Sequence, residues 1–386
     1  MENLLIAGVN TRPMVNSGLQ LNYNILSASY YLTYDFKKPF YEKHILDQEK
    51  GKSCGFFENN YSKDILLDLI KEFLNDTDYI IPVSGISPND FNNKYKKKIL
   101  GNPNTTKIEN KLDFYKKIKN KYLTPETFKV KDITEVDEIV KNSEGKEYII
   151  KPIKGFGGYG INLLNNESSN ELNDIENQWI IQEYIKGKNI SSSVLATKND
   201  SQTIINSKNI SNESFIYEGN ILPLNNELLG NSYENIIENI NETSEKIIND
   251  FKLIGSNGID YILDENNELY VLEINPRLQG TYECCETLLK INMLDAHIKA
   301  CENELIEVDS NIKEYCLKKI VYSKNKMKVG NLSKIKNIYD IPYPEVIIEK
   351  NQPFVTIIQK NNNLRSLYNH LDSTCANIKK CLTKVK

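Results

Sequence analysis

A cluster of glycines between two predicted strands constrains the fold of this chain more than any other feature. The stretch YIIKPIKGFGGYGI, residues 148–161, holds four of the chain's 18 glycines, namely Gly155, Gly157, Gly158 and Gly160. Glycine costs backbone entropy on folding, so such a cluster indicates that another group approaches the main chain closely. The apolar segments 148–153 and 161–164 on either side predict strands. Together they predict a hairpin with a glycine-rich tip.

This tip does not match the two familiar phosphate-binding loops. A P-loop needs Lys-Ser/Thr after its glycines, and both it and the dinucleotide-binding loop lead into a helix. Here no Lys-Ser/Thr pair follows Gly160, and the next segment is a predicted strand. A hairpin tip can instead fold over a triphosphate, with its backbone amides and the ammonium group of Lys151 neutralising charge. The alternative is a flexible hairpin that binds nothing.

A second motif, GIDYILDENNELYVLEINPRLQG, covers residues 258–280 and predicts two strands, 259–263 and 269–274, joined by a polar turn. Glu273 and Asn275 are two residues apart, so their side chains share one face. If Leu263 pairs with Tyr270, the antiparallel register also places Asp260 opposite Glu273.

Two carboxylates and an amide oxygen are hard oxygen ligands of the kind that Mg²⁺ or Mn²⁺ prefers. Asp260, Glu273 and Asn275 are therefore the candidate metal ligands. A register slip of one residue would turn Asp260 away. The other interpretation is an exposed polar strand face without a ligand.

The arginines are few and well placed. Only Arg12, Arg277 and Arg365 are arginine among 48 basic residues. Arginine grips carboxylate or phosphate with a planar fork that lysine does not reproduce. Arg277 follows the acidic strand within two residues, and Arg12 lies after the first predicted strand, where α/β sheets bind ligands. Both are candidate substrate-binding residues, with a structural salt bridge as the alternative for each.

Composition excludes several classes of protein. The net charge of −4 and a pI near 5.7 argue against a nucleic-acid partner. Seven cysteines without Cys-x-x-Cys spacing and three scattered histidines suggest neither disulfides, a zinc site nor a serine-type triad. The N-terminus resembles neither a signal peptide nor a membrane span. We expect a soluble cytoplasmic protein with small-molecule substrates, of a size that predicts two or three subdomains.

The remaining pattern predicts an α/β chain with an α+β C-terminal part. Residues 3–9 and 24–28 read as strands around a short helix, and a strand at 79–84 follows a helical stripe at Leu67, Ile70 and Leu74. These features predict a small doubly wound domain.

Three further segments complete the prediction. A helix is expected to carry Ile108, Leu112, Tyr115 and Ile118 on one face, and another is expected over 232–253. The polar stretch 165–177 is expected to be a loop or a short helix.

The chain resembles the ATP-dependent carboligase branch of the ATP-grasp superfamily in four features that follow one another in the same order: Lys111, the glycine loop that begins with Lys151 and Pro152, QEYIKG (182–187) and LEINPR (272–277). This branch is related to the ATP-binding modules of biotin carboxylase and carbamoyl phosphate synthetase. The resemblance covers residues 1–300. It implies a Rossmann-like pre-ATP-grasp domain (1–100), a two-lobed ATP-grasp domain (101–300, hinge near 182–187) and a C-terminal α+β segment (301–386).

The resemblance also implies roles for individual residues. Lys111 and Lys151 would contact the ATP phosphates under the flap Gly155–Gly160, Glu183 the adenine amino group, and the main chain of Tyr184 and Ile185 the ring edge. Asp260, Glu273 and Asn275 match magnesium ligands. Arg277 matches the arginine that holds the acyl phosphate or carboxylate, which makes Arg277 and Lys151 the candidate catalytic residues.

The implied reaction is ATP-dependent amide-bond formation between a carboxylate and an amine through an acyl phosphate, on a small molecule such as an amino acid. Biotin carboxylase has a catalytic glutamate where this chain has Thr281, which argues against biotin carboxylation. Two alternatives stay open: an ATP-dependent carboxylase acting through carboxyphosphate, and an ATP-binding module without turnover. The oligomeric state is not predicted.

Overall fold

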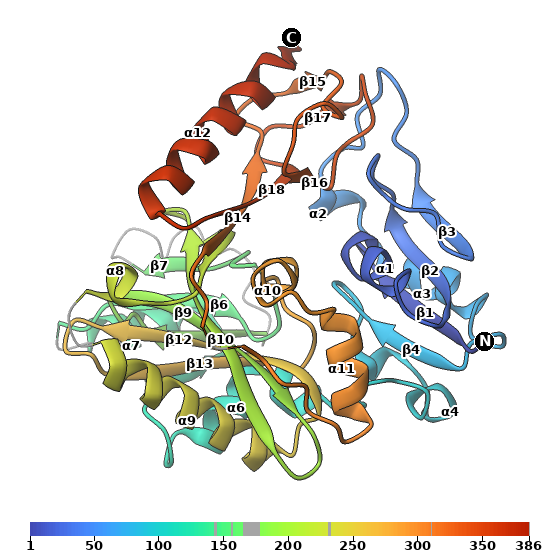
Figure 1. Ribbon diagram of the computed structural model, residues 1–386. Helices are drawn as coiled ribbons and strands as arrows, with labels where there is room; N and C mark the ends of the chain where they lie inside the picture. The colour runs from blue at the N-terminus through green and yellow to red at the C-terminus, as the bar shows by residue number, and fades with distance from the viewer. Residues whose placement is uncertain (143–144, 156, 165–177, 231–232, 310, 386) are drawn as a thin grey trace.

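The computed structural model describes residues 1–142, 145–155, 157–164, 178–230, 233–309 and 311–385. Its N-terminal part is built on a parallel sheet in the order β3-β2-β1-β4 (Figure 1). The strands are β1 (Asn3–Gly8), β2 (Asn24–Tyr31), β3 (Tyr41–Leu46) and β4 (Tyr79–Pro82). Helix α1 (Arg12–Gly18) packs on one face and α3 (Lys63–Lys71) on the other. This confirms the predicted doubly wound arrangement.

A four-stranded antiparallel sheet forms the first lobe of the central region. Its order is β5-β8-β6-β7, with β5 (Thr127–Val130), β6 (Tyr148–Pro152), β7 (Asn162–Leu164) and β8 (Trp179–Glu183). Helix α7 (Ile133–Lys141) packs against it. Strands β6 and β7 pair antiparallel on either side of the glycines, so the predicted glycine-tipped hairpin is confirmed. The polar stretch 165–177 lies outside the described residues.

The second lobe is an eight-stranded sheet in the order β13-β12-β9-β10-β11-β14-β18-β16. Its strands are β9 (Gly187–Ala196), β10 (Ser201–Ser211), β11 (Tyr217–Leu222), β12 (Gly255–Asp264), β13 (Leu269–Asn275), β14 (Tyr315–Tyr322), β16 (Ile338–Tyr339) and β18 (Pro353–Asn361). Helix α9 (Tyr233–Phe251) packs on one face, and α10 (Tyr282–Leu289) and α11 (Met293–Cys301) on the other.

Three of the C-terminal strands, β14, β16 and β18, extend the large sheet. A small sheet of β17 (Ile347–Ile348), β15 (Met327–Val329) and β19 (Leu382–Lys384) and the long helix α12 (Leu364–Lys380) complete this part (Figure 1). The division at residues 100 and 300 stays a prediction. The remaining short elements are α2 (Phe57–Asn60), the 3-10 turn η1 (Pro88–Asp90), α4 (Asn93–Lys96) and α8 (Asn226–Leu229).

The single helix predicted over residues 108–118 is wrong. The chain forms α5 (Thr106–Glu109) and α6 (Lys111–Ile118), because the Asn110 side chain accepts a hydrogen bond from the Asp113 amide (2.9 Å) and caps the start of α6. The amide of Lys111 donates to the carbonyl of Ile153 at 3.2 Å, just after β6. The break therefore fixes Lys111 beside the glycine flap.

Within the described part of the chain, we find no helix whose length and apolar character would let it cross a membrane.

Candidate active site

A cavity of about 650 Å³ lies between the two lobes, and the predicted site residues gather in it. The lining includes the two lysines, three of the flap glycines, the hinge and the acidic strand pair: Lys111, Lys151, Gly155, Gly157, Gly158, Glu183, Tyr184, Ile185, Asp260, Glu273, Asn275 and Arg277. Gly160 and Arg12 are not among the lining residues. The sequence motifs from four separate regions thus meet in one place.

The acidic residues face each other, although the expected strand register is partly wrong. Leu263 pairs with Leu269 rather than with Tyr270, because the turn is one residue tighter than predicted. A β-bulge between Asp260 and Tyr261 then shifts the register and brings Asp260 opposite Glu273. The predicted pairing of the two carboxylates is therefore confirmed through a bulge that the sequence did not indicate.

The surroundings of the two carboxylates give them different proton affinities. Burial and the adjacent charge of Glu273 raise the pKa of Asp260 to about 6. Asp260 accepts hydrogen bonds from the Ser191 hydroxyl and from Nδ2 of Asn275, the latter at 2.8 Å. Burial opposes ionisation of Glu273, but the charges of Lys111 and Lys151 outweigh it and lower the pKa of that carboxyl. Lys111 Nζ lies 3.1 Å from Glu273 Oε2.

These residues fit a divalent cation. Two neighbouring carboxylates repel each other in a buried site, which is the effect that raises the pKa of Asp260. The amide oxygen of Asn275 adds a third hard donor, and all three side chains reach the same cavity. A Mg²⁺ ion is the type of group that such a set of oxygens binds.

Lys151 is a buried cation in the lining of the cavity. Its side chain is 5 % exposed, and Nζ donates to Gln182 Oε1 at 2.7 Å. Gln182 is held in turn by donating Nε2 to Thr127 Oγ1 at 2.9 Å. Burial and the nearby charge of Lys111 lower the pKa of Lys151 to about 8. A bound anion would relieve this unfavourable burial of charge.

The glycine flap docks on the turn between β10 and β11. The amide of Tyr217 donates to the carbonyl of Gly157 at 2.9 Å. A side chain at Gly158 would lie 1.9 Å from the Phe215 carbonyl oxygen, so only glycine permits this approach. Gly160 instead packs near Pro152 and Trp179, outside the cavity.

The hinge residues lie at the end of β8, whose last residue is Glu183. The carboxylate of Glu183 is held by Lys146 at 3.2 Å and by the Glu126 amide at 3.2 Å. The Tyr184 amide donates to the Glu147 carbonyl at 2.8 Å, so its carbonyl is the backbone group that Tyr184 can offer a ligand. Ile185 lines the cavity beside it.

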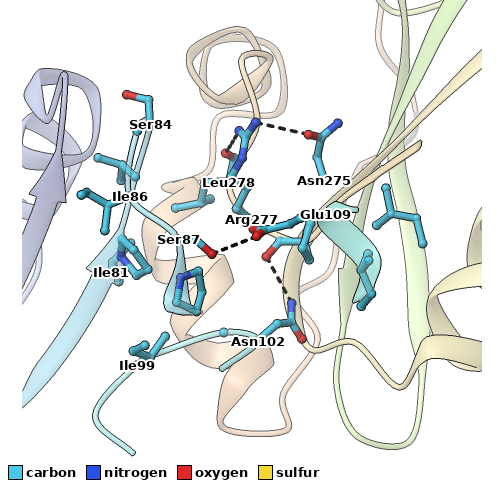
Figure 2. Close-up of a pocket in the computed structure, with 18 of the residues that line it drawn as sticks. Ile81, Ser84, Ile86, Ser87, Ile99, Asn102, Glu109, Asn275, Arg277 and Leu278 are labelled. Carbon is cyan, nitrogen blue, oxygen red and sulfur yellow. Dashed lines mark hydrogen bonds between the residues drawn. The ribbon is translucent and has the colours of Figure 1, made fainter. Parts of the chain in front are cut away.

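A second cavity, of about 370 Å³, adjoins the first (Figure 2). Lys111, Glu273, Asn275 and Arg277 line both cavities, and the loop after β4 closes the far side. The Arg277 guanidinium donates to Asn275 Oδ1 at 3.2 Å and to the Leu278 carbonyl at 3.3 Å. Among the described residues it forms no ion pair with a carboxylate, so it remains able to bind an anion.

Arg12 lies elsewhere. It is 2 % exposed, and donates to Asp340 at 2.8 Å and to Glu283 at 2.7 Å. These contacts link the N-terminal domain to α10 and to the C-terminal part. Its proposed role in substrate binding gains no support, because three carboxylates already surround it: Asp340, Glu283 and, at 3.5 Å, Asp35.

Several residues of the site were not found by sequence reasoning. Ser191, which binds Asp260, was missed, although small polar residues at alternate positions of β9 are a signal that it faces the site. Gln182 was expected only as part of the hinge, and its contact with Lys151 was not predicted. The contact of Tyr217 with the flap has no signal in the sequence. No sequence signal indicated that Glu109 would line the second cavity either.

Comparisons with known proteins identify the family of the chain. The family model of the ATP-grasp domain matches residues 108–281. The uncharacterized protein MJ0776 of Methanocaldococcus jannaschii is 31% identical over 386 residues, which is 97% of this chain and 92% of that protein. The tyramine–L-glutamate ligase of Methanocaldococcus fervens is 27% identical over 228 residues, covering 58% of this chain and 65% of that enzyme.

Solved structures share the fold across nearly the whole chain. The N5-carboxyaminoimidazole ribonucleotide synthetase of Thermotoga maritima superposes with a TM-score of 0.70 at 16% identity, covering 99% of both chains. ATP and Mg²⁺ are accordingly the cofactors of this family, which includes ATP-dependent ligases and carboxylases. The chain belongs to the ATP-grasp superfamily.

Proposed function

We propose that the chain is an ATP- and Mg²⁺-dependent carboxylate–amine ligase that forms an amide bond through an acyl phosphate. In this proposal Lys111, Lys151 and the flap hold the ATP phosphates, and Tyr184 and Ile185 hold the base. Arg277 holds the carboxylate of the substrate. Asp260, Glu273 and Asn275 bind the metal.

The observation that carries the proposal is the shared wall of the two cavities. Lys111, Glu273, Asn275 and Arg277 line both, so phosphate groups bound in the larger cavity would lie next to a substrate in the smaller one. Arg277 is a cation at this junction that forms no ion pair with a carboxylate of the described residues, although its charge favours the ionised forms of Asp260 and of Glu273. A carboxylate substrate held there would be adjacent to the reacting phosphate.

The reaction depends more on neutralising the charge of the phosphoryl group and on excluding water than on a side chain that transfers protons. A carboxylate oxygen attacks the γ-phosphorus, the bond to ADP breaks, and the acyl phosphate forms. The amine then attacks the acyl carbon, and inorganic phosphate leaves. Lys111 and Lys151 neutralise the phosphoryl oxygens, and the docked flap excludes water that would hydrolyse the acyl phosphate. A bound Mg²⁺ would supply further charge neutralisation on the phosphates.

Two features favour amide formation over carboxylation. One relative is named for joining tyramine to L-glutamate. In addition, Thr281 is buried and shares a hydrogen bond of 3.0 Å with Ser193, so no carboxylic acid stands at the position where biotin carboxylase has its glutamate. Carboxylation through carboxyphosphate is the second candidate, because the synthetase fold is shared. A nucleotide-binding module without turnover is the third.

Trapping with hydroxylamine tests the proposal. The purified chain is incubated with Mg-ATP, hydroxylamine and each of a panel of amino acids and other carboxylates, and hydroxamates are detected by mass. We expect one class of carboxylate to give hydroxamate and stoichiometric ADP. When that carboxylate carries ¹⁸O, one ¹⁸O should appear in the phosphate. ADP release that depends on bicarbonate alone would favour the carboxylase, and binding of Mg-ATP without ADP release would favour the inactive module.

A further inference from the structure

The smaller cavity carries a feature that the proposed chemistry does not use. Glu109, at the end of α5, lines it and is only partly exposed. Its Oε2 accepts hydrogen bonds from the Ser87 hydroxyl at 2.9 Å and from Asn89 Nδ2 at 3.3 Å, and Figure 2 shows Ser87 and Glu109 facing each other. Among the described residues, Glu109 forms no ion pair. A carboxylate fixed in this way has one oxygen left for a ligand.

The basic side chains that line the described part of the cavity form no ion pair with Glu109. Lys63 pairs with Asp90 at 2.7 Å, and Lys111 pairs with Glu273 at 3.1 Å. His297 is neutral, because burial lowers its pKa to about 4. Lys154 is exposed at the rim, and no ion pair joins it to Glu109 in the described structure.

Most of the remaining lining is apolar. It includes buried side chains from β4, from the loop after it and from the segments around α5 and Arg277: Ile81, Ile86, Ile99, Ile108 and Leu278. Each of these side chains is less than a tenth exposed over its whole surface. A ligand of this cavity therefore gains free energy from an apolar body as well as from its charged group.

We infer that this cavity binds the amine substrate as its ammonium form, with the nitrogen on Glu109 and an apolar body against the isoleucines. The inference rests on the proposed ligase function and names the class of its second substrate: a primary amine on a hydrocarbon or aromatic body. Arg277 and Glu109 divide the cavity into an anion-binding and a cation-binding end. The acyl group and the amine thus bind to separate, oppositely charged residues of one small space.

A binding experiment with matched ligands tests this. Calorimetric titrations measure the dissociation constants of phenethylamine and of its neutral counterpart 2-phenylethanol for the full chain, with Mg²⁺ and a non-hydrolysable ATP analogue present. If the ammonium group forms a charged hydrogen bond with Glu109, the wild-type chain should bind the amine on the order of 10- to 100-fold more tightly than the alcohol. In Glu109→Gln this preference should largely disappear, while Glu109→Asp should retain part of it.

A surface variant provides the control. Glu242→Gln removes an exposed carboxylate on α9 that pairs only with Lys246 in the described structure, and it should keep the full preference for the amine. The thermal unfolding midpoint shows whether Glu109→Gln is folded. The comparison of amine with alcohol within one variant cancels general losses of binding, so a merely structural role of Glu109 would weaken both ligands equally.

Two results would overturn the inference: equal affinity of the wild-type chain for phenethylamine and 2-phenylethanol, or an unchanged preference in Glu109→Gln. The wild-type chain's hydroxamate formation needs no amine substrate. Failure of hydroxamate formation therefore contradicts the proposed function. If the wild-type chain forms hydroxamate but does not prefer the amine, or if Glu109→Gln keeps the wild-type preference, only the assignment of Glu109 is contradicted.

Discussion

Replacing Gly158 by alanine should prevent the flap from closing over the nucleotide. Gly158 has a φ of +82°, which alanine adopts only at a cost, and the added Cβ would lie 1.9 Å from the Phe215 carbonyl oxygen. No real Cβ contact is that short. The flap must therefore move away from the β10–β11 turn, and the hydrogen bond from the Tyr217 amide to Gly157 is then lost.

The size of the effect follows from these two terms. A left-handed conformation costs a non-glycine residue roughly 1–2 kcal/mol, and a hydrogen bond contributes about 0.5–1.5 kcal/mol. Both terms apply only to the docked flap, since an undocked flap can relax. Together they amount to roughly 2–3 kcal/mol, which corresponds to Mg-ATP binding weaker by roughly 30- to 150-fold if the docked flap is the nucleotide-bound form.

The chain contains its own reporter for this measurement. Trp179 is the single tryptophan, and its ring lies 3.4 Å from the position of a Cβ on Gly160 in the flap. Titrating its fluorescence with Mg-ATP gives the dissociation constant. Gly145→Ala is the control, because Gly145 has a φ of +90° but no atom within 4 Å of the added Cβ, so nucleotide affinity should stay within about twofold. Wild-type affinity in Gly158→Ala would refute the reasoning.

Three further predictions concern charge. Lys151→Ala and Glu273→Gln should lower hydroxamate formation on the order of a hundredfold or more, as loss of a preorganised charge does, and near-normal rates in both would contradict the site. Arg277→Lys should lower kcat for hydroxamate formation at least tenfold, because lysine lacks the planar fork; an unchanged kcat would remove Arg277 from the site. Burial opposes ionisation of Asp340, but Arg12 outweighs it and lowers the pKa of that carboxyl. Its contribution to stability is therefore present above about pH 4 and lost as the pH falls below it. Asp340→Asn should reduce the free energy of unfolding by about 3 kcal/mol at pH 7, and by progressively less in acid, in denaturant titrations; a difference independent of pH would contradict this.

Local patterns were sufficient to predict the glycine-tipped hairpin and the shared face of Glu273 and Asn275. A β-hairpin is a short-range structure, so glycines between two apolar runs identified its tip, and the two-residue period of a strand placed Glu273 and Asn275 on one face. The meeting of these motifs in one cavity depends on how distant strands pair. It was expected only from the resemblance to a known family.

What the sequence did not predict depends on tertiary contacts. The expected helix is interrupted at Asn110, which caps α6, because the amide of Lys111 donates its hydrogen bond to the carbonyl of Ile153, more than forty residues along the chain. The bulge beside Asp260 compensates for the tighter turn at Leu263, and neither follows from side-chain alternation. The position of Glu109 in a cavity was not predictable, because it depends on the tertiary packing of the loop after β4 against α5.

The most direct test of the central claim, that Asp260 and Glu273 hold the metal of a bound nucleotide, is electron paramagnetic resonance with Mn²⁺ as the probe. The signal of free Mn²⁺ is followed as the chain is added with a non-hydrolysable ATP analogue. The Glu265→Gln variant, altered at an exposed position of the same hairpin, is the control. We predict saturable, nucleotide-dependent uptake of Mn²⁺ by the wild-type and control chains, and its loss in an Asp260→Asn, Glu273→Gln double variant that keeps its unfolding midpoint. Uptake by the double variant equal to that of the wild type would contradict the claim.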